Sequence, residues 1–263
     1  MHERVPRGRL PSDSHAADMV AFRCCSGSTT RRERMRRLQP RPRLLRLASA
    51  SAAAVVYASW IRPRMRSWGA TPAETIRTFP GDELIPDPNG GATMGTTLPA
   101  PPKRVWPWLL QMGGGRGGWY SWDWVDNAGE PSADRIVPEW QDLELGQHLQ
   151  RPASPAVPKD PTNWWTVAVL EPNRTLVLQT SYDLFGRSFD PRTGPEPLAS
   201  TEGTWGFYLQ EADKDRSRLV VRTRSRSRPL LTHALSLLVG EPVHLVMQTR
   251  QFHNLRTRVA ADL

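Results

Sequence analysis

The stretch PPKRVWPWLLQMGGGRGGWYSWDWVDN, residues 101–127, decides the fold, because it joins a helical pattern to a glycine run and an aromatic segment. Four apolar residues have the i, i+3, i+4, i+7 spacing of a buried helix face: Val105, Trp108, Leu109 and Met112. This pattern predicts a helix that begins at Pro101 and Pro102. The glycines of residues 113–118 then predict a turn that lets the aromatic residues fold back.

Gly113, Gly115 and Gly118 also satisfy the G-x-G-x-x-G spacing of a dinucleotide-binding turn. That fingerprint requires a strand before the glycines and a helix that opens among them. Here a helical pattern precedes the glycines and bulky aromatic residues follow them. The context therefore argues against a phosphate-binding loop.

The basic charge of the chain belongs to its N-terminal segment. The net charge is +9, and residues 1–66 hold 15 arginines against 4 acidic residues, so the rest of the chain is slightly acidic. Residues 1–43 lack apolar periodicity, which predicts a disordered extension. Only one aromatic residue, Phe22, lies among their arginines, so nucleic acid is not an expected partner. A translation start at Met19 or Met35 would leave only a short basic region before the next segment.

An apolar helix is expected over residues 44–66. Its uncharged part, LASASAAAVVYASWI from Leu47 to Ile61, is shorter than the roughly 20 residues of a full membrane span. Three interpretations remain open: a short N-terminal anchor, a peripheral helix on an anionic membrane surface, or a helix packed on the domain. The flanking arginines favour membrane association, and a cytoplasmic location is the alternative.

The body of the chain is predicted to mix strands and helices. The capping-box spacing TPAE, Thr71 to Glu74, predicts a short helix inside a linker over residues 67–90. Patterns of period 2 predict strands at residues 91–98, 143–149, 164–170, 175–180 and 218–228. Pro242 suits the first turn of a final helix that runs to about Ala260.

The strand at residues 218–228 has arginines at every even position except 220. Because alternate residues of a strand share a face, these arginines are expected on one side of the sheet. A solvated outer face is the favoured interpretation, and an anion site is the alternative.

The order of these elements resembles the START-like (SRPBCC) superfamily, with its Bet v 1-like, polyketide cyclase and lipid-transfer relatives. The residues that carry this likeness are the opening stretch, SADRIVPEWQDLELGQ at 132–147 and EPVHLVMQTR at 241–250. The stretches RSWGATPAE and PGDELIPDP are similar to an uncharacterised actinobacterial branch, whose members often carry N-terminal membrane segments. The resemblance implies an α+β helix-grip domain over residues 91–263, in which a curved antiparallel sheet wraps around a long C-terminal helix. It also implies a cavity between the sheet and that helix.

The leading functional hypothesis is binding or transfer of a hydrophobic small molecule, lipid or polyketide-like, in this cavity. Candidate ligand-binding residues are Trp108, Met112, Tyr120, Trp122, Arg135, Trp205, Phe207 and Met247. The competing interpretation is that the aromatic members of this set fill the core.

Two further function classes stay open. One is a cyclase or hydratase-like enzyme that uses acidic residues of the same pocket, for which Asp123 and Glu139 are weak candidates. The other is a non-catalytic interaction module. The adjacent Cys24 and Cys25 and the wide histidine spacing do not match metal-ligand patterns, and no cofactor motif is present. A binding protein is favoured over an enzyme.

Overall fold

The computed structural model describes residues 42–152, 163–191, 193–229, 233 and 236–261. The chain forms two units, residues 1–53 and 54–263. The described part of the first unit is the beginning of helix α2 (Pro42–Val56). Every described strand belongs to the second unit, to which the following observations refer.

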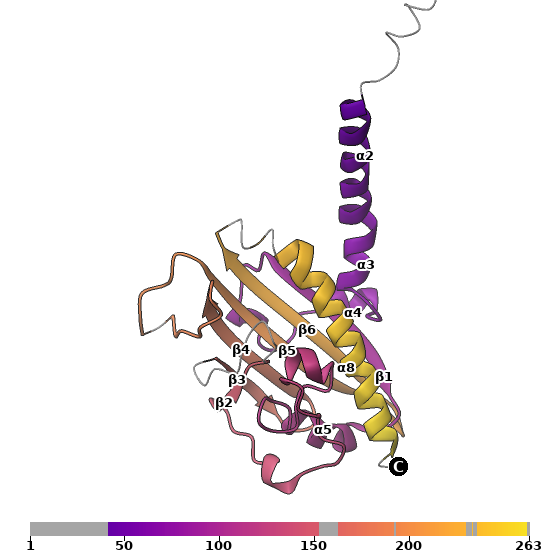
Figure 1. Ribbon diagram of the computed structural model, residues 1–263. Helices are drawn as coiled ribbons and strands as arrows, with labels where there is room; N and C mark the ends of the chain where they lie inside the picture. The colour runs from indigo at the N-terminus through magenta and orange to yellow at the C-terminus, as the bar shows by residue number, and fades with distance from the viewer. Residues whose placement is uncertain (1–41, 153–162, 192, 230–232, 234–235, 262–263) are drawn as a thin grey trace, which may run out of the picture. The chain divides into compact units, whose positions relative to one another are not determined.

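The second unit is built on a six-stranded antiparallel sheet with the strand order β1-β6-β5-β4-β3-β2 (Figure 1). The strands are β1 (Gly90–Leu98), β2 (His148–Gln150), β3 (Trp164–Glu171), β4 (Thr175–Asp183), β5 (Ser200–Asp213) and β6 (Arg216–Arg228). The long helix α8 (Glu241–Ala261) lies across one face of this curved sheet. Its buried residues Phe252, Leu255 and Val259 join the main core. The chain thus has the α+β helix-grip fold expected from the sequence.

Shorter helices connect these elements. They are η1 (Tyr57–Ile61), α3 (Arg62–Arg66), α4 (Pro72–Ile76), η2 (Asp82–Leu84), α5 (Pro102–Leu110), α6 (Asp123–Asp126), η3 (Pro138–Trp140) and η4 (Ser236–Gly240). The predicted capping box is confirmed, since Glu74 N donates to Thr71 Oγ1 and Thr71 N donates to a Glu74 carboxylate oxygen.

Arg218, Arg222 and Arg224 of β6 are mostly buried and do not form the solvated face that the sequence favoured. Arg228, at the end of the strand, is exposed. Residues of the expected linker cover the three buried arginines: Arg218 forms an ion pair with Glu74 at 2.7 Å, and Arg222 forms one with Asp82 at 2.8 Å. Phe79, from the same covering segment, packs in a second, smaller core with Val177 and other residues of the sheet. The acidic and apolar side chains of residues 71–86 therefore bury this part of the sheet face.

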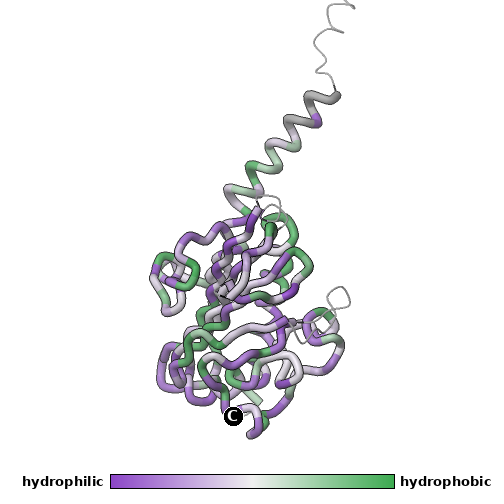
Figure 2. Tube along the Cα trace, turned by 90° about the vertical axis from the view of Figure 1, so that its left-hand side faces the viewer, coloured by the Kyte–Doolittle hydropathy of each residue, from purple (hydrophilic) through white to green (hydrophobic). Residues whose placement is uncertain are grey.

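Within the described residues, no helix combines the length and the hydrophobicity that crossing a bilayer requires. In Figure 2 the coloured part of the N-terminal helix mixes pale and green tones with a purple segment.

Candidate functional site

A cavity of about 410 Å³ lies between the sheet and the first half of α8. The sheet contributes Trp165, Tyr182 and Trp205 to its wall, and α8 contributes His244, Met247 and Gln248 among others. Ser121 and Asp126 close one side, and Arg151 contributes to another. Such a volume, with mainly aromatic and apolar walls, is in the range of small-molecule sites.

The glycine run positions the segment that closes the cavity. Gly113 and Gly118 exchange two backbone hydrogen bonds of 3.0 and 3.1 Å, which reverses the chain after α5. Gly118 has φ +73°, and a Cβ there would lie 2.5 Å from Ser132 Oγ, so glycine is needed. The reversed chain brings Ser121 to α8, where its hydroxyl donates to the carbonyl oxygen of Met247 at 3.0 Å. A helix precedes these glycines and a four-residue helix follows them, which is not the context of a dinucleotide-binding turn.

A chain of buried hydrogen bonds joins the sheet, α8 and the aromatic turn. Trp205 Nε1 donates to Gln248 Oε1 at 3.3 Å, and Gln248 Nε2 donates to Gln251 Oε1 at 2.7 Å. Gln251 Nε2 in turn donates to the carbonyl oxygen of Trp119 at 2.8 Å. Trp119 also stacks on Trp205, with ring centroids 5.3 Å apart. These bonds hold the cavity walls in one arrangement.

Three polar atoms of cavity-lining residues are buried and have no hydrogen-bond partner among the described residues. They are Asp126 Oδ1, Arg151 Nε and Trp165 Nε1. Arg151 otherwise lies over the ring of Tyr182 at 4.1 Å and donates to the carbonyl oxygen of Gly186. Buried polar groups in folded proteins nearly always have partners, so these three atoms are exceptions, and all three belong to residues of the cavity wall.

Two ionisable groups of the cavity have altered proton affinities. Burial, together with the negative charge of Asp123, raises the pKa of Asp126 to about 7. Burial lowers the pKa of His244 to about 4, although the nearby Glu241 acts in the opposite direction. At neutral pH, His244 is therefore uncharged, and Asp126 is poised between its two protonation states.

The structure distributes the predicted ligand-binding residues over three environments. Trp205 and Met247 line the cavity. Four others are completely buried in the main core: Trp108, Met112, Tyr120 and Phe207. They fill space behind the cavity wall because α5 and the aromatic turn pack against the sheet there.

The last two predicted ligand-binding residues lie outside the cavity wall. Trp122 is 37% exposed, and its ring is covered by Arg250 at 4.6 Å. Arg135 is exposed, and its carbonyl oxygen accepts a hydrogen bond from Gln111.

The two acidic residues expected as weak catalytic candidates also lie outside the cavity wall. Asp123 accepts a hydrogen bond from Ser132 Oγ at 2.5 Å, and Glu139 is exposed in η3. Asp126, three residues after Asp123, is instead the carboxyl that lines the cavity. Among the described residues, no three His, Cys, Asp or Glu side chains are grouped so that they could hold a metal ion.

Sequence reasoning missed Gln248 and Gln251 as well. Both lie on the buried stripe of α8 that contains Phe252 and Leu255. Polar residues within an apolar stripe were the signal that could have identified them.

No family model matches the chain, and no curated protein matches it. Solved structures of similar fold were found at low identity. Protein MLL2253 from Mesorhizobium loti is 14% identical, with 65% of this chain and 98% of that chain covered and a TM-score of 0.39. A protein from Arthrobacter aurescens is 14% identical, with 71% and 92% covered and a TM-score of 0.38. DynU16, from the dynemicin biosynthetic locus, is 16% identical, with 65% and 48% covered and a TM-score of 0.36. Likenesses this weak carry no argument about function, so the function is argued from the cavity.

Proposed function

We propose that this protein, as a member of the START-like superfamily, binds a hydrophobic small molecule in the cavity between the sheet and α8. The observation that carries this proposal is the cavity of about 410 Å³ with mainly aromatic and apolar walls, three of whose lining residues have a buried polar atom without a partner among the described residues. An apolar ligand with a few oxygen atoms would remove water from the walls and supply the missing hydrogen bonds.

The chemistry of the three atoms indicates what the ligand offers. Trp165 Nε1 and Arg151 Nε are donors, so each needs an acceptor such as a carbonyl or hydroxyl oxygen. Asp126 accepts a hydrogen bond when ionised and can donate one when protonated. An oxygenated lipid or a polyketide-like molecule has groups of both kinds.

The test uses the neutral fluorophore Nile red and two variants of adjacent residues on α8. Met247→Trp places a larger side chain in the cavity wall, whereas Val246→Trp adds the same side chain at a position that is 55% exposed. We expect Met247→Trp to abolish Nile red binding and Val246→Trp to preserve it. Thermal unfolding of both variants verifies that they are folded. Equal binding by folded Met247→Trp and the native protein would contradict the proposal.

Native mass spectrometry of protein purified from its own host gives an independent readout. A retained compound of lipid or polyketide-like mass would support a binding function. It should be absent from the Met247→Trp variant prepared in the same way.

An enzyme that acts on the same ligand is the second candidate, favoured by the pKa of about 7 at the cavity-lining Asp126. A carboxyl that titrates near neutral pH inside a cavity suits general acid–base catalysis. Asp126→Asn keeps the shape of the side chain and removes its proton transfer. For an enzyme, the compound retained by this variant should differ in mass from the one retained by the native protein. Identical masses would favour a binding protein.

Peripheral contact with an anionic membrane is a further part of the proposal. Val55, Val56, Trp60 and Ile61 are between 48% and 66% exposed. Three arginines follow directly at positions 62, 64 and 66. Apolar side chains beside cations are the composition of surfaces that bind anionic bilayers.

A further inference from the structure

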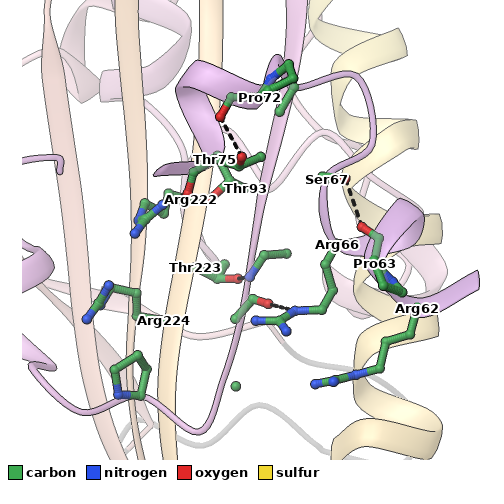
Figure 3. Close-up of a pocket in the computed structure, with 15 residues that line it drawn as sticks. Arg62, Pro63, Arg66, Ser67, Pro72, Thr75, Thr93, Arg222, Thr223 and Arg224 are labelled. Carbon is green, nitrogen blue, oxygen red and sulfur yellow. Dashed lines mark hydrogen bonds between the residues drawn. The ribbon is translucent and has the colours of Figure 1, made fainter. Parts of the chain in front are cut away.

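A groove lies outside the cavity, along the edge strand β1. It has a volume of about 520 Å³ and lies between β1, α3 and α4. Four arginines line it, Arg62, Arg66, Arg222 and Arg224, and none of its lining residues is acidic. In Figure 3, Arg62 and Arg66 extend from α3 toward the middle of the groove, and Arg222 and Arg224 lie across from them. The groove is therefore a cationic surface.

Three of these arginines are already held by protein acceptors. Arg62 donates to both carboxylate oxygens of Glu241, at 2.7 and 2.8 Å. Arg222 donates to Asp82 at 2.8 Å, and Arg224 donates twice to the carbonyl oxygen of Ile85. Their guanidinium groups are thus bound by acceptors within the protein.

Arg66 is different. Its Nε donates to the carbonyl oxygen of Gly91, and its nearest carboxylate oxygen, on Glu241, is 3.8 Å away and already bonded to Arg62. Its two terminal nitrogens donate no hydrogen bond to any described residue, and 38% of the side chain is exposed. Burial lowers the pKa of Arg66, which reflects a cation that is only partly compensated.

A hollow of about 240 Å³, which we call the throat, adjoins both the groove and the cavity, since it shares lining residues with each. Arg66 lines both the groove and the throat, and Tyr182 and His244 line both the throat and the cavity. Thr223 lines all three. A ligand that extends from the cavity through the throat would therefore reach Arg66.

The charges beside the throat do not cancel. Arg66 and Glu241 line the throat, and Glu241 is already paired with Arg62, which lines the groove but not the throat. His244 is neutral at pH 7, so these charged side chains are two cations and one anion. One positive charge remains, and its free donors belong to a guanidinium, which matches the oxygen atoms of a carboxylate or phosphate.

We propose that the ligand is an anionic amphiphile, whose carboxylate or phosphate binds Arg66 while its apolar part passes through the throat into the cavity. This inference rests on the proposed binding function and adds the charge of the ligand and the residue that recognises it. The observations indicate a ligand with a single anionic group on an apolar body. The test ligands distinguish whether that group is a carboxylate or a phosphate.

The experiment measures displacement of Nile red by dodecanoate, dodecyl phosphate and the neutral methyl dodecanoate, at about pH 8, where the carboxylate is ionised. For the native protein we expect at least one anion to bind about 10-fold more tightly than the ester, as one added charge-assisted hydrogen bond allows. The preferred anion identifies the source of the group, carboxylate or phosphate.

Three variants test whether Arg66 causes the preference for the anion over the ester. Arg66→Gln should bring the affinity of the anion down to that of the ester and leave the ester unchanged. Arg66→Lys should retain part of the preference, because it retains the charge. Arg77→Gln removes an exposed arginine that lines neither groove nor throat, and should keep the full preference.

Three results would overturn the inference. If both anions and the ester bind the native protein equally, or if Arg66→Gln weakens all three alike, Arg66 does not recognise an anionic group, and the proposed binding function stands. If neither Nile red nor the ester binds at all, the binding function fails, and this inference fails with it.

Discussion

The indole Nε1 of Trp205, on strand β5, donates a hydrogen bond of 3.3 Å to Oε1 of Gln248, on helix α8. Both residues line the cavity, so this bond joins its sheet wall to its helix wall. It also gives a buried donor its partner, so the two residues depend on each other.

Gln248→Ala should therefore destabilise the protein. The substitution leaves Trp205 Nε1 without its acceptor and Gln251 Oε1 without its donor, which costs about 1 to 3 kcal/mol for unpaired buried groups. Urea denaturation measures the change in the free energy of unfolding. His253→Ala, at an exposed position of the same helix, is the control, with an expected change within about 0.5 kcal/mol. Equal effects of the two variants would contradict the role of the bond.

Gly118→Ala should be more harmful than Gly129→Ala, although both glycines have positive φ. A Cβ at Gly118 would lie 2.5 Å from Ser132 Oγ, whereas a Cβ at Gly129 would have no atom within 4 Å. Both variants bear the backbone cost of about 1 to 2 kcal/mol. Gly118→Ala adds crowding of about 1 to 3 kcal/mol. Thermal unfolding compares the two variants, and equal midpoints would show that the turn tolerates a side chain.

Asp126 should make stability depend on pH. Its pKa rises from the ordinary 3.8 to about 7 in the folded protein, so between these values the folded state holds a proton that the unfolded chain has released. The contribution of Asp126 to stability therefore falls as the pH rises through this range and is constant above it.

Asp126→Asn removes this dependence. We expect the variant to unfold at a higher temperature than the native protein at about pH 8 and to match it at about pH 4. Asp142→Asn, at an exposed position, should match the native protein at both values. If Asp126→Asn were more stable than the native protein only at the acidic pH, the pKa of Asp126 would be lowered in the folded protein and not raised.

Trp60 should contribute to membrane binding. Trp60→Ser removes a ring that is 66% exposed beside Arg64, whose guanidinium lies 4.7 Å from the ring centroid. In sedimentation with phosphatidylglycerol-containing vesicles at low salt, the full-length variant should bind several-fold more weakly, as the loss of an aromatic interfacial anchor predicts. Trp124→Ser is the matched control, because Trp124 is 65% exposed and lies on α6. If both variants bind as the native protein does, the proposed surface is not used.

Local patterns allowed several elements to be predicted. The capping box at Thr71, the buried face of α5 and the period-2 pattern of β1 each depend on residues close in sequence, and the structure contains all three elements. The final helix likewise begins at Glu241, so that Pro242 lies in its first turn, where proline fits.

Long-range pairing could not be predicted in the same way. Arg222 and Asp82 are 140 residues apart, and periodicity states only that the arginines of β6 share a face, not what covers it. The same limit applies to the cavity: Asp123 and Asp126 look alike in sequence, and only their burial distinguishes the carboxyl that lines the cavity from the one that accepts a hydrogen bond from Ser132.

Residues 71–86 cover an apolar part of the outer sheet face that would otherwise be open to other copies of the protein. Val177 and Val220 lie on that face beneath Phe79, and each is at most 2% exposed. A fragment that begins at residue 90 would contain every described strand but would present these valines and the unpaired arginines to solvent. An apolar sheet face left open in this way attracts other copies of itself. Residues 71–86 thus shield this apolar face from other copies of the protein. We expect the fragment without them to aggregate under conditions in which the longer chain stays monodisperse.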